Sequence, residues 1–152
     1  MYQIVYRSRS KRMLSAADLH SMLTGFRSYN AAHRLTGILL HSWGNFLQLL
    51  EGEEADVTEI FRRIQADQRH DKIALIDVTL PGRMFSDWSM AFVDLTELAR
   101  VAPGFAGFPS DLDLRAIDDA TVLELLTFFS EQRGLLRESE PTSAAASGTV
   151  PA

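Results

Sequence analysis

The sequence predicts an α+β fold of the ferredoxin-like kind, in which five strands form one mixed sheet in the order βαββαββ. Two helices cover one face of this sheet, and a C-terminal helical extension covers the other. Two observations support the prediction. Short segments alternate apolar and polar residues with the period of a strand, and longer segments between them carry apolar stripes with the period of a helix. A strand–helix–strand unit that occurs twice around a hairpin is typical of this fold.

The chain begins with a strand and a helix. Residues 2–7 alternate between two faces and predict the first strand. Ser15, with Asp18 three positions later, resembles a capping box, so the first helix begins here and is expected to end near Asn30. The apolar stripe of this helix consists of Leu19, Met22, Leu23 and Phe26.

A hairpin follows the first helix. Residues 35–41 form a short apolar run with a β-branched residue, and residues 45–50 form another. Trp43 and Gly44 between them are a hairpin signal. The two runs are therefore predicted to be the second and third strands.

The second helix and two further strands complete the sheet. Asp56 is a candidate N-cap for the helix. Residues 72–80 alternate β-branched and aliphatic side chains and predict a strand, Pro81 and Gly82 predict a turn, and residues 89–93 predict the fifth strand. The apolar stripe of the second helix consists of Val57, Ile60, Phe61 and Ile64.

The pattern changes after the fifth strand. Residues 96–101 predict a short helix, residues 103–109 a Gly/Pro-rich loop, and residues 118–133 an amphipathic helix that packs on the sheet face opposite the first two helices. The last stretch is rich in Ser, Ala, Pro and Thr, a composition typical of disorder. We divide the chain into a sheet domain (1–95), a helical extension (96–136) and a disordered tail (137–152).

The composition indicates one ordinary globular domain. Of the 152 residues, 46% are apolar and 23% are charged, which suffices for a hydrophobic core. The net charge of −5 argues against a nucleic-acid-binding face, although the adjacent Arg62 and Arg63 leave a local basic patch as the alternative to a solvated helix face. No apolar run approaches the ~18–20 residues that cross a bilayer, and the N-terminus has no signal-peptide layout. We expect a cytoplasmic protein that binds neither membrane nor nucleic acid.

Metal and thiol chemistry are not expected. The chain has no cysteine, which removes disulfides, thiolate nucleophiles and cysteine metal sites. The four histidines show no spacing typical of metal ligands. They are His20, His33, His41 and His70.

Two polar side chains fall on strand faces that ought to be covered. Alternation places Gln48 beside Phe46 and Leu50, and Tyr6 beside Ile4. An unpaired buried amide costs about 1–3 kcal/mol, so Gln48 needs hydrogen-bond partners. Tyr6 and Gln48 could simply bond each other or the backbone and fill space.

Further side chains on inner faces point to a ligand. Trp88, Met90 and Phe92 are predicted to point the same way from the fifth strand. Together with Met22 and Ile64 on the helix stripes, they could surround a flat, polarisable ring with a hydrogen-bonding rim. Flavin is one candidate among several on these physical grounds.

Two other polar residues have structural interpretations as well. Asn30 could be a helix C-cap, a role in which Asn is common. His70, which follows Arg69 after the second helix, could reflect the polarity of a loop.

Five short motifs stand in a fixed order along the chain. They are Tyr6-Arg7-Ser8; Asn30 followed by Leu35-Thr36-Gly37; Phe46-Leu47-Gln48-Leu49-Leu50-Glu51-Gly52; Asp67-Gln68-Arg69-His70; and Phe85 followed by Trp88-Ser89-Met90. In this order and spacing they resemble the BLUF family, blue-light sensors that use FAD. The resemblance extends over residues 2–95, and the third motif is the most specific.

The resemblance implies that FAD is held without a covalent bond between the two helices. Asn30 would bond the pyrimidine edge of the isoalloxazine ring, with Arg69 and His70 helping at the same rim. Met22 and Ile64 match the positions that contact the ring faces.

The resemblance also implies the photochemistry, which needs no cysteine. Tyr6 would donate an electron and a proton under blue light, and Gln48 would bridge it to flavin N5 and O4. Trp88 and Met90 would sense the rearrangement of the glutamine and carry it into the fifth strand.

Two positions depart from the family pattern. Tyr29 stands where some relatives have a hydrogen-bonding Asn or His, and Phe26 occupies a position that is often small or polar. Tyr29 could alter the contacts to the ring carbonyls or act as a second electron donor.

No catalytic domain is recognisable after residue 95, so the resemblance is to short, stand-alone photoreceptors without enzyme activity. Such proteins act by binding a partner protein or further copies of themselves. Two other functions remain open: a small ferredoxin-like hydrolase, and a flavin-free regulatory module. The hydrolase would need a phosphate-binding loop and a nucleophile–base pair, which the sequence lacks. The colour of the purified protein separates the sensor from both.

Overall fold

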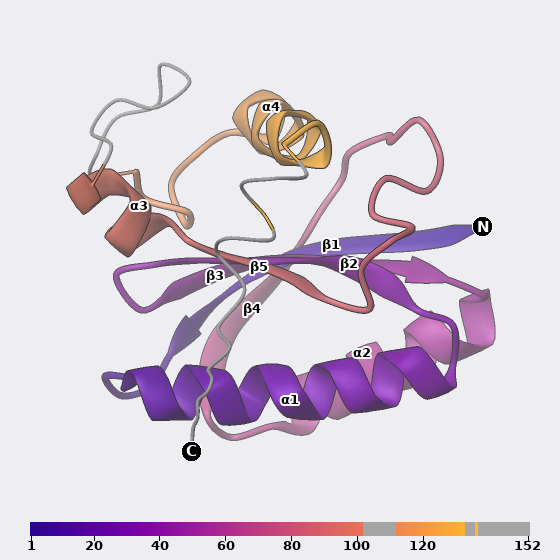
Figure 1. Cartoon of the computed structure of the whole chain (residues 1–152), viewed down its shortest axis with the longest axis horizontal. Coiled ribbons are helices and arrows are strands. Elements are labelled where there is room, and N and C mark those ends of the chain that lie inside the picture. Colours follow the sequence, from indigo (N-terminus) through magenta and orange to yellow (C-terminus); the bar gives the residue numbers. More distant parts are fainter. Residues whose placement is uncertain (102–111, 133–135, 137–152) are drawn as a thin grey trace.

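A mixed sheet of five strands forms the middle layer of the structure (Figure 1). The computed structural model describes residues 1–101, 112–132 and 136. The strands are β1 (Tyr2–Ser10), β2 (Thr36–Ser42), β3 (Asn45–Gly52), β4 (His70–Ile76) and β5 (Ala91–Asp94). They lie in the order β4-β1-β3-β2-β5, and all neighbours are antiparallel except β2 and β5, which are parallel. The predicted ferredoxin-like fold is confirmed.

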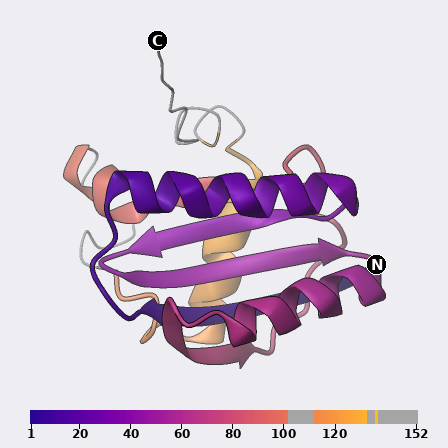
Figure 2. The same ribbon diagram turned by 90° about the horizontal axis from the view of Figure 1, so that it is seen from below.

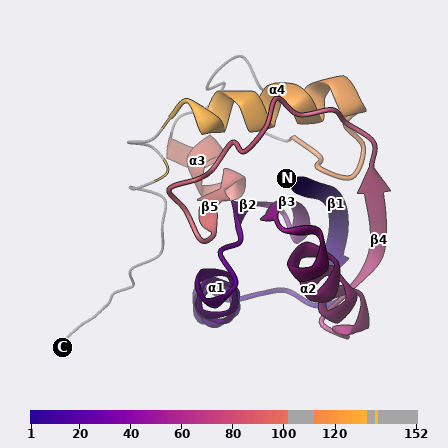
Figure 3. The same ribbon diagram turned by 90° about the vertical axis from the view of Figure 1, so that its right-hand side faces the viewer.

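Helices cover both faces of the sheet. They are α1 (Ala16–Ala32), α2 (Glu54–Ala66), α3 (Leu95–Val101) and α4 (Asp119–Ser130). The end-on view in Figure 3 places α1 and α2 together on one face and α4 on the other, as predicted. Within the described ranges, no helix combines the length and apolar character that a membrane span requires.

The first helix begins where the sequence predicts and ends slightly later. The hydroxyl of Ser15 accepts a bond from the backbone N–H of Asp18 at 3.1 Å, and the Asp18 carboxylate accepts one from the N–H of Ser15 at 2.9 Å. This reciprocal pair is a capping box. The helix ends with His33 as its C-cap, so Asn30 lies inside the helix and its interpretation as the C-cap is wrong.

Several predicted boundaries are wrong, and in the strands the pairing with neighbours decides where each element begins or ends. Residue 53 rather than Asp56 is the N-cap of α2, and Asp56 lies in the first helical turn. β4 begins at His70 and stops at Ile76, since its register with β1 runs from Ser10 opposite His70 to Val5 opposite Ile76. β5 begins at residue 91 rather than 89, where pairing with β2 starts.

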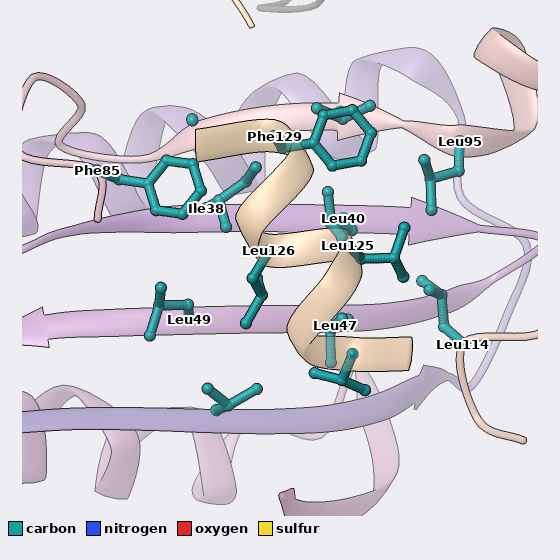
Figure 4. Packing of buried hydrophobic residues seen from close by; sticks show 14 of the residues in the cluster. Ile38, Leu40, Leu47, Leu49, Phe85, Leu95, Leu114, Leu125, Leu126 and Phe129 are labelled. Atoms are coloured by element: carbon teal, nitrogen blue, oxygen red, sulfur yellow. The ribbon is translucent and has the colours of Figure 1, made fainter. Parts of the chain in front are cut away.

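The sheet separates two hydrophobic clusters. On one face, α4 covers β2 and β3 with Leu125, Leu126 and Phe129, as Figure 4 shows. The cluster on the other face fills the space between the sheet and α1 with α2. The predicted loop 103–109 and tail 137–152, with residue 133 at the predicted end of α4, lie outside the described residues.

Gly37 provides a test of the close contact between β2 and β3. A Cβ atom at this position would overlap the carbonyl oxygen of Leu49. Gly37→Ala is therefore expected to lower the free energy of unfolding by about 1–3 kcal/mol, measured by urea titration of the chain without bound small molecules. In the control Gly25→Ala, the new methyl group meets open space within α1, and stability should rise by about 0.5–1 kcal/mol. Equal effects at the two positions would contradict the packing.

Candidate functional site

The strand register brings the predicted site residues together on one sheet face. Tyr6 of β1 lies opposite Gln48 of β3, which in turn lies opposite Leu39 of β2. Leu39 lies opposite Phe92 of β5. Because strand side chains alternate, all four point toward the cluster under α1 and α2.

Tyr6, Gln48 and Met90 form a chain of buried polar contacts. The Tyr6 hydroxyl donates a hydrogen bond to Oε1 of Gln48, and Nε2 of Gln48 lies 3.5 Å from Sδ of Met90. Gln48 and Met90 are fully buried, and Tyr6 is 2% exposed. The amide thus connects a phenol on one strand to a weak sulfur acceptor beside another.

Burial keeps the Tyr6 phenol neutral. Desolvation raises its pKa far above the ordinary value of 10.0, and the negative charge of Asp67 raises it further. The ring of Tyr6 packs against Phe61 of α2 with centroids 5.4 Å apart. Tyr6 therefore holds its proton until that proton is given to a hydrogen-bonded acceptor.

A hollow lies between the two helices, and the Tyr6 end of this chain of contacts is part of its lining. Figure 2 shows α1 and α2 flanking the middle strands of the sheet. The lining of the hollow comes from both helices and the sheet and includes Tyr6, Ser8, Met22, Phe26, Leu39, Phe46, Ile64, Asp67, Arg69 and His70.

Asn30 has an unsatisfied acceptor. Its side chain is fully buried, and Nδ2 donates to the carbonyl oxygen of Ser89 at 2.7 Å. Oδ1 has no hydrogen-bond partner among the residues described. Asn30 stands one helical turn after Phe26, which lines the hollow. A buried acceptor left unpaired costs about 1–3 kcal/mol, so a ligand donor here would be stabilising.

Arg69 and His70 both line the hollow but differ in burial and in their partners. Arg69 is exposed and forms an ion pair with Asp67 at 2.6 Å, which lowers the pKa of that carboxyl group. His70 is half-buried, and its ring nitrogens lie 2.6 Å from the carbonyl oxygen of Ile64 and 3.1 Å from the hydroxyl of Ser8. His70 starts β4 and has two partners, so its interpretation as loop polarity is wrong.

Trp88 lies on the other side of the sheet. It packs against the cluster under α4, whereas Met90 and Phe92 belong to the cluster under α1 and α2. The prediction that all three point the same way is wrong, because the Trp88 N–H bonds the carbonyl of Phe85 at 2.9 Å in a turn before the strand. Alternation does not apply to residues outside a paired strand.

The two departures from the family pattern stand at the hollow and its edge. Phe26 lines the hollow. Tyr29 stacks on His33 at 4.0 Å between ring centroids, and the guanidinium of Arg63 lies 4.9 Å above its ring. Tyr29 thereby connects α1 to α2.

Sequence reasoning missed the contacts that hold the segment before β5. Nε of Arg27 donates to the carbonyl oxygen of Met90 at 2.9 Å. The backbone N–H of Gly37 donates to the carbonyl oxygen of Trp88 at 3.2 Å. With the bond from Asn30 to Ser89, three consecutive carbonyls are held by α1 and β2. Such bonds join residues that are far apart in the sequence, so no local sequence pattern predicts them.

The chain matches the sequence profile of the family described as "BLUF: Sensors of blue-light using FAD" over residues 1–91. The chain belongs to the BLUF family. The dark-state structure of the BLUF protein BlrB is 34% identical, has a TM-score of 0.68, and matches 84% of this chain and 93% of its own.

Two curated BLUF relatives are much longer proteins. The photoactivated adenylate cyclase subunit beta of Euglena gracilis is 31% identical over 66% of this chain and 12% of its own length. The blue light- and temperature-regulated antirepressor BluF of Escherichia coli (strain K12) is 34% identical over 60% of this chain and 23% of its own length. The BLUF chain thus spans less than a quarter of either relative.

The residues present fit FAD, the cofactor by which the BLUF family is defined. The hollow has apolar walls from Met22 and Ile64, as a flat ring requires. Oδ1 of Asn30 is a buried acceptor for a ring N–H, and the Gln48 amide offers both a donor and an acceptor. Within the described part of the BLUF chain, no group of three His, Cys, Asp or Glu side chains could hold a metal ion.

The protonation of Tyr6 can be measured directly. The phenolate absorbance gained between neutral pH and about pH 11 should be equal in the wild type and in Tyr6→Phe, because the folded state keeps this proton. Unfolded chains lose it near pH 10, so this tyrosine makes the fold less stable as the pH rises above about 10. If the folded wild type gains more phenolate absorbance than Tyr6→Phe, by the amount that one tyrosine contributes, Tyr6 is not protected by burial.

Proposed function

We propose that this BLUF protein is a blue-light photoreceptor in which Tyr6 and Gln48 switch the hydrogen bonds offered to FAD. The observation that carries the proposal is the buried chain from the Tyr6 hydroxyl through the Gln48 amide to the Met90 sulfur. Its Tyr6 end lines the hollow between α1 and α2. Asn30, Arg69 and His70 would hold the polar rim, with Met22 and Ile64 against the ring faces.

When bound, the isoalloxazine ring supplies blue-light absorption and a strongly oxidising excited state. Tyr6 supplies an electron and a proton, since its hydroxyl already donates to Oε1 of Gln48. Gln48 would relay the proton, and once the electron and the proton have returned to Tyr6, the amide would be left in another orientation or tautomer. Because the donor and acceptor ends differ, this change alters the hydrogen bonds at the ring and shifts its absorption slightly to the red.

Met90 provides the route by which the change leaves the site. In the structure its sulfur faces the Gln48 nitrogen, a weak bond that a turned amide would replace by an oxygen contact. Met90 directly precedes β5, and β5 continues without a break into α3. We therefore assign Met90 as the direct sensor. Trp88 responds through the backbone, because its side chain packs on the opposite face.

The output is a change in binding to a partner protein or to a second copy of the chain. The Euglena and Escherichia coli relatives are named as a photoactivated cyclase subunit and a light-regulated antirepressor. By analogy, residues 1–95 form the sensor and residues 96–136 pass its state to the partner. The extension is well placed for this, since α4 covers β2 and β3 and Arg7 of β1 donates to the carbonyl oxygens of Leu114 and Ile117 at 3.1 and 2.9 Å.

Colour tests the proposal most simply. The purified protein should be yellow, release FAD on denaturation, and show a small, reversible red shift under blue light. A colourless protein that takes up no FAD on reconstitution would contradict it and favour a flavin-free module or a hydrolase.

Tyr6→Phe tests the donor. The variant keeps the ring that packs on Phe61 but lacks the hydroxyl, so FAD should stay bound while the reversible red shift disappears. The control is Tyr2→Phe on the same strand, whose side chain is 36% exposed; it should shift as the wild type does. A normal shift in Tyr6→Phe would refute the assignment of the donor.

Gln48→Leu tests the amide switch. Leucine fills a similar volume but leaves the Tyr6 hydroxyl unpaired, so the free energy of unfolding should fall by about 1–3 kcal/mol. FAD binding should be nearly intact, and absorption spectra under blue light should show no red shift. The exposed Gln68→Leu serves as the control. If Gln48→Leu shows a normal photocycle, the amide does not switch.

A further inference from the structure

Glu51 is a fully buried carboxylate that the proposed photochemistry does not use. It lies near the end of β3, and each of its oxygens accepts two hydrogen bonds. Oε1 accepts from the Thr36 hydroxyl and the Phe85 N–H, both at 3.0 Å. Oε2 accepts from Nε2 of Gln3 at 2.9 Å and from the Met84 N–H at 2.6 Å. Bonds to an ionised acceptor are about twice as strong as neutral ones.

Two of these donors belong to the backbone that leads from β4 to β5. Met84 and Phe85 lie at one end of the segment that terminates in Met90. The other end is held by the bonds from Gly37, Asn30 and Arg27 to the carbonyls of residues 88–90. The segment is therefore fixed at both ends, and Glu51 alone among these contacts supplies a carboxylate.

The same strand carries Glu51 and the switching amide. Gln48 and Glu51 are three residues apart on β3, so their side chains leave opposite faces of the sheet. On one face Gln48 contacts the sulfur of Met90, and on the other Glu51 holds the backbone that leads to Met90. β3 therefore carries Gln48 directly and, through Glu51, holds the backbone segment that carries Met90.

We infer that Glu51 is a positioning residue of the light switch, which fixes where Met90 meets the Gln48 amide by holding the backbone of Met84 and Phe85. The inference rests on the proposed function of Gln48 and Met90. Glu51 itself touches neither side chain and acts through the segment 84–90. Arg83 supports it indirectly, since its Nη1 donates to the Thr36 hydroxyl at 2.7 Å.

Glu51→Gln tests the inference with little change in volume. The amide has one oxygen, so whichever way it turns, two donors lose their acceptor, and one of them is the N–H of Met84 or Phe85. We expect faster hydrogen exchange at whichever of these two N–H groups loses its acceptor, and dark recovery about tenfold faster than in the wild type, because the loss of one charged hydrogen bond is of this size. The control is the exposed Glu53→Gln, whose side chain caps no N–H.

A second comparison separates positioning from a general loss of stability. In a Met90→Leu background, Glu51→Gln should change dark recovery by less than about twofold, because the effect passes through Met90. The same factor in both backgrounds, or an unchanged recovery in the single variant, would overturn the inference. If Glu51→Gln does not fold, Thr36→Val can replace it, because this variant removes one donor to the carboxylate. Dark recovery of Thr36→Val should then be faster than that of the wild type. An unchanged dark recovery in Thr36→Val would overturn the inference as well.

The role of Glu51 and the proposed photoreceptor function can be refuted separately. If the wild type and Glu53→Gln show a reversible red shift and Glu51→Gln recovers at the same rate, only the inference about Glu51 is wrong. If neither the wild type nor Glu53→Gln shows a shift after reconstitution with FAD, the proposed function is wrong and the inference with it.

Discussion

The hydrogen bond between the Tyr6 hydroxyl and the Gln48 amide is the interaction on which the account depends. It joins two polar side chains that are almost completely buried, where an unpaired group would cost about 1–3 kcal/mol. Antiparallel pairing of β1 and β3 fixes the two residues opposite each other, so the contact is set by the backbone and not by flexible loops. A change in the position or protonation of either group therefore forces the other group to rearrange.

In the proposed mechanism, burial of both faces of the sheet would give a change at this contact a direction. One face carries the chain from Tyr6 to Met90 under α1 and α2, and the other is sealed by α4. The segment before β5 touches both faces, with Met90 on one and Trp88 on the other. Its ends are held by Glu51 and by the donors from α1 and β2, so under the proposed mechanism the Met90 side chain would be the part that responds.

The sequence was sufficient wherever a regular period decides the structure. Alternation on β1 and β3 predicted that Tyr6 and Gln48 lie on covered faces, and helical spacing predicted that Met22 and Ile64 lie on the apolar stripes, from which both line the hollow. It failed where tertiary pairing or turns decide: Trp88 lies in a turn, so alternation assigned it to the wrong face. The four bonds to Glu51 come from three separate parts of the chain, and no local pattern encodes them.

The most direct measurement is a crystal structure of the FAD-bound protein kept in darkness. The isoalloxazine ring is expected between α1 and α2, with the Gln48 amide and Oδ1 of Asn30 within hydrogen-bond distance of its rim and the Tyr6 hydroxyl still bonded to Gln48. A ring bound elsewhere, or a phenol and an amide that both lie remote from it, would contradict the account.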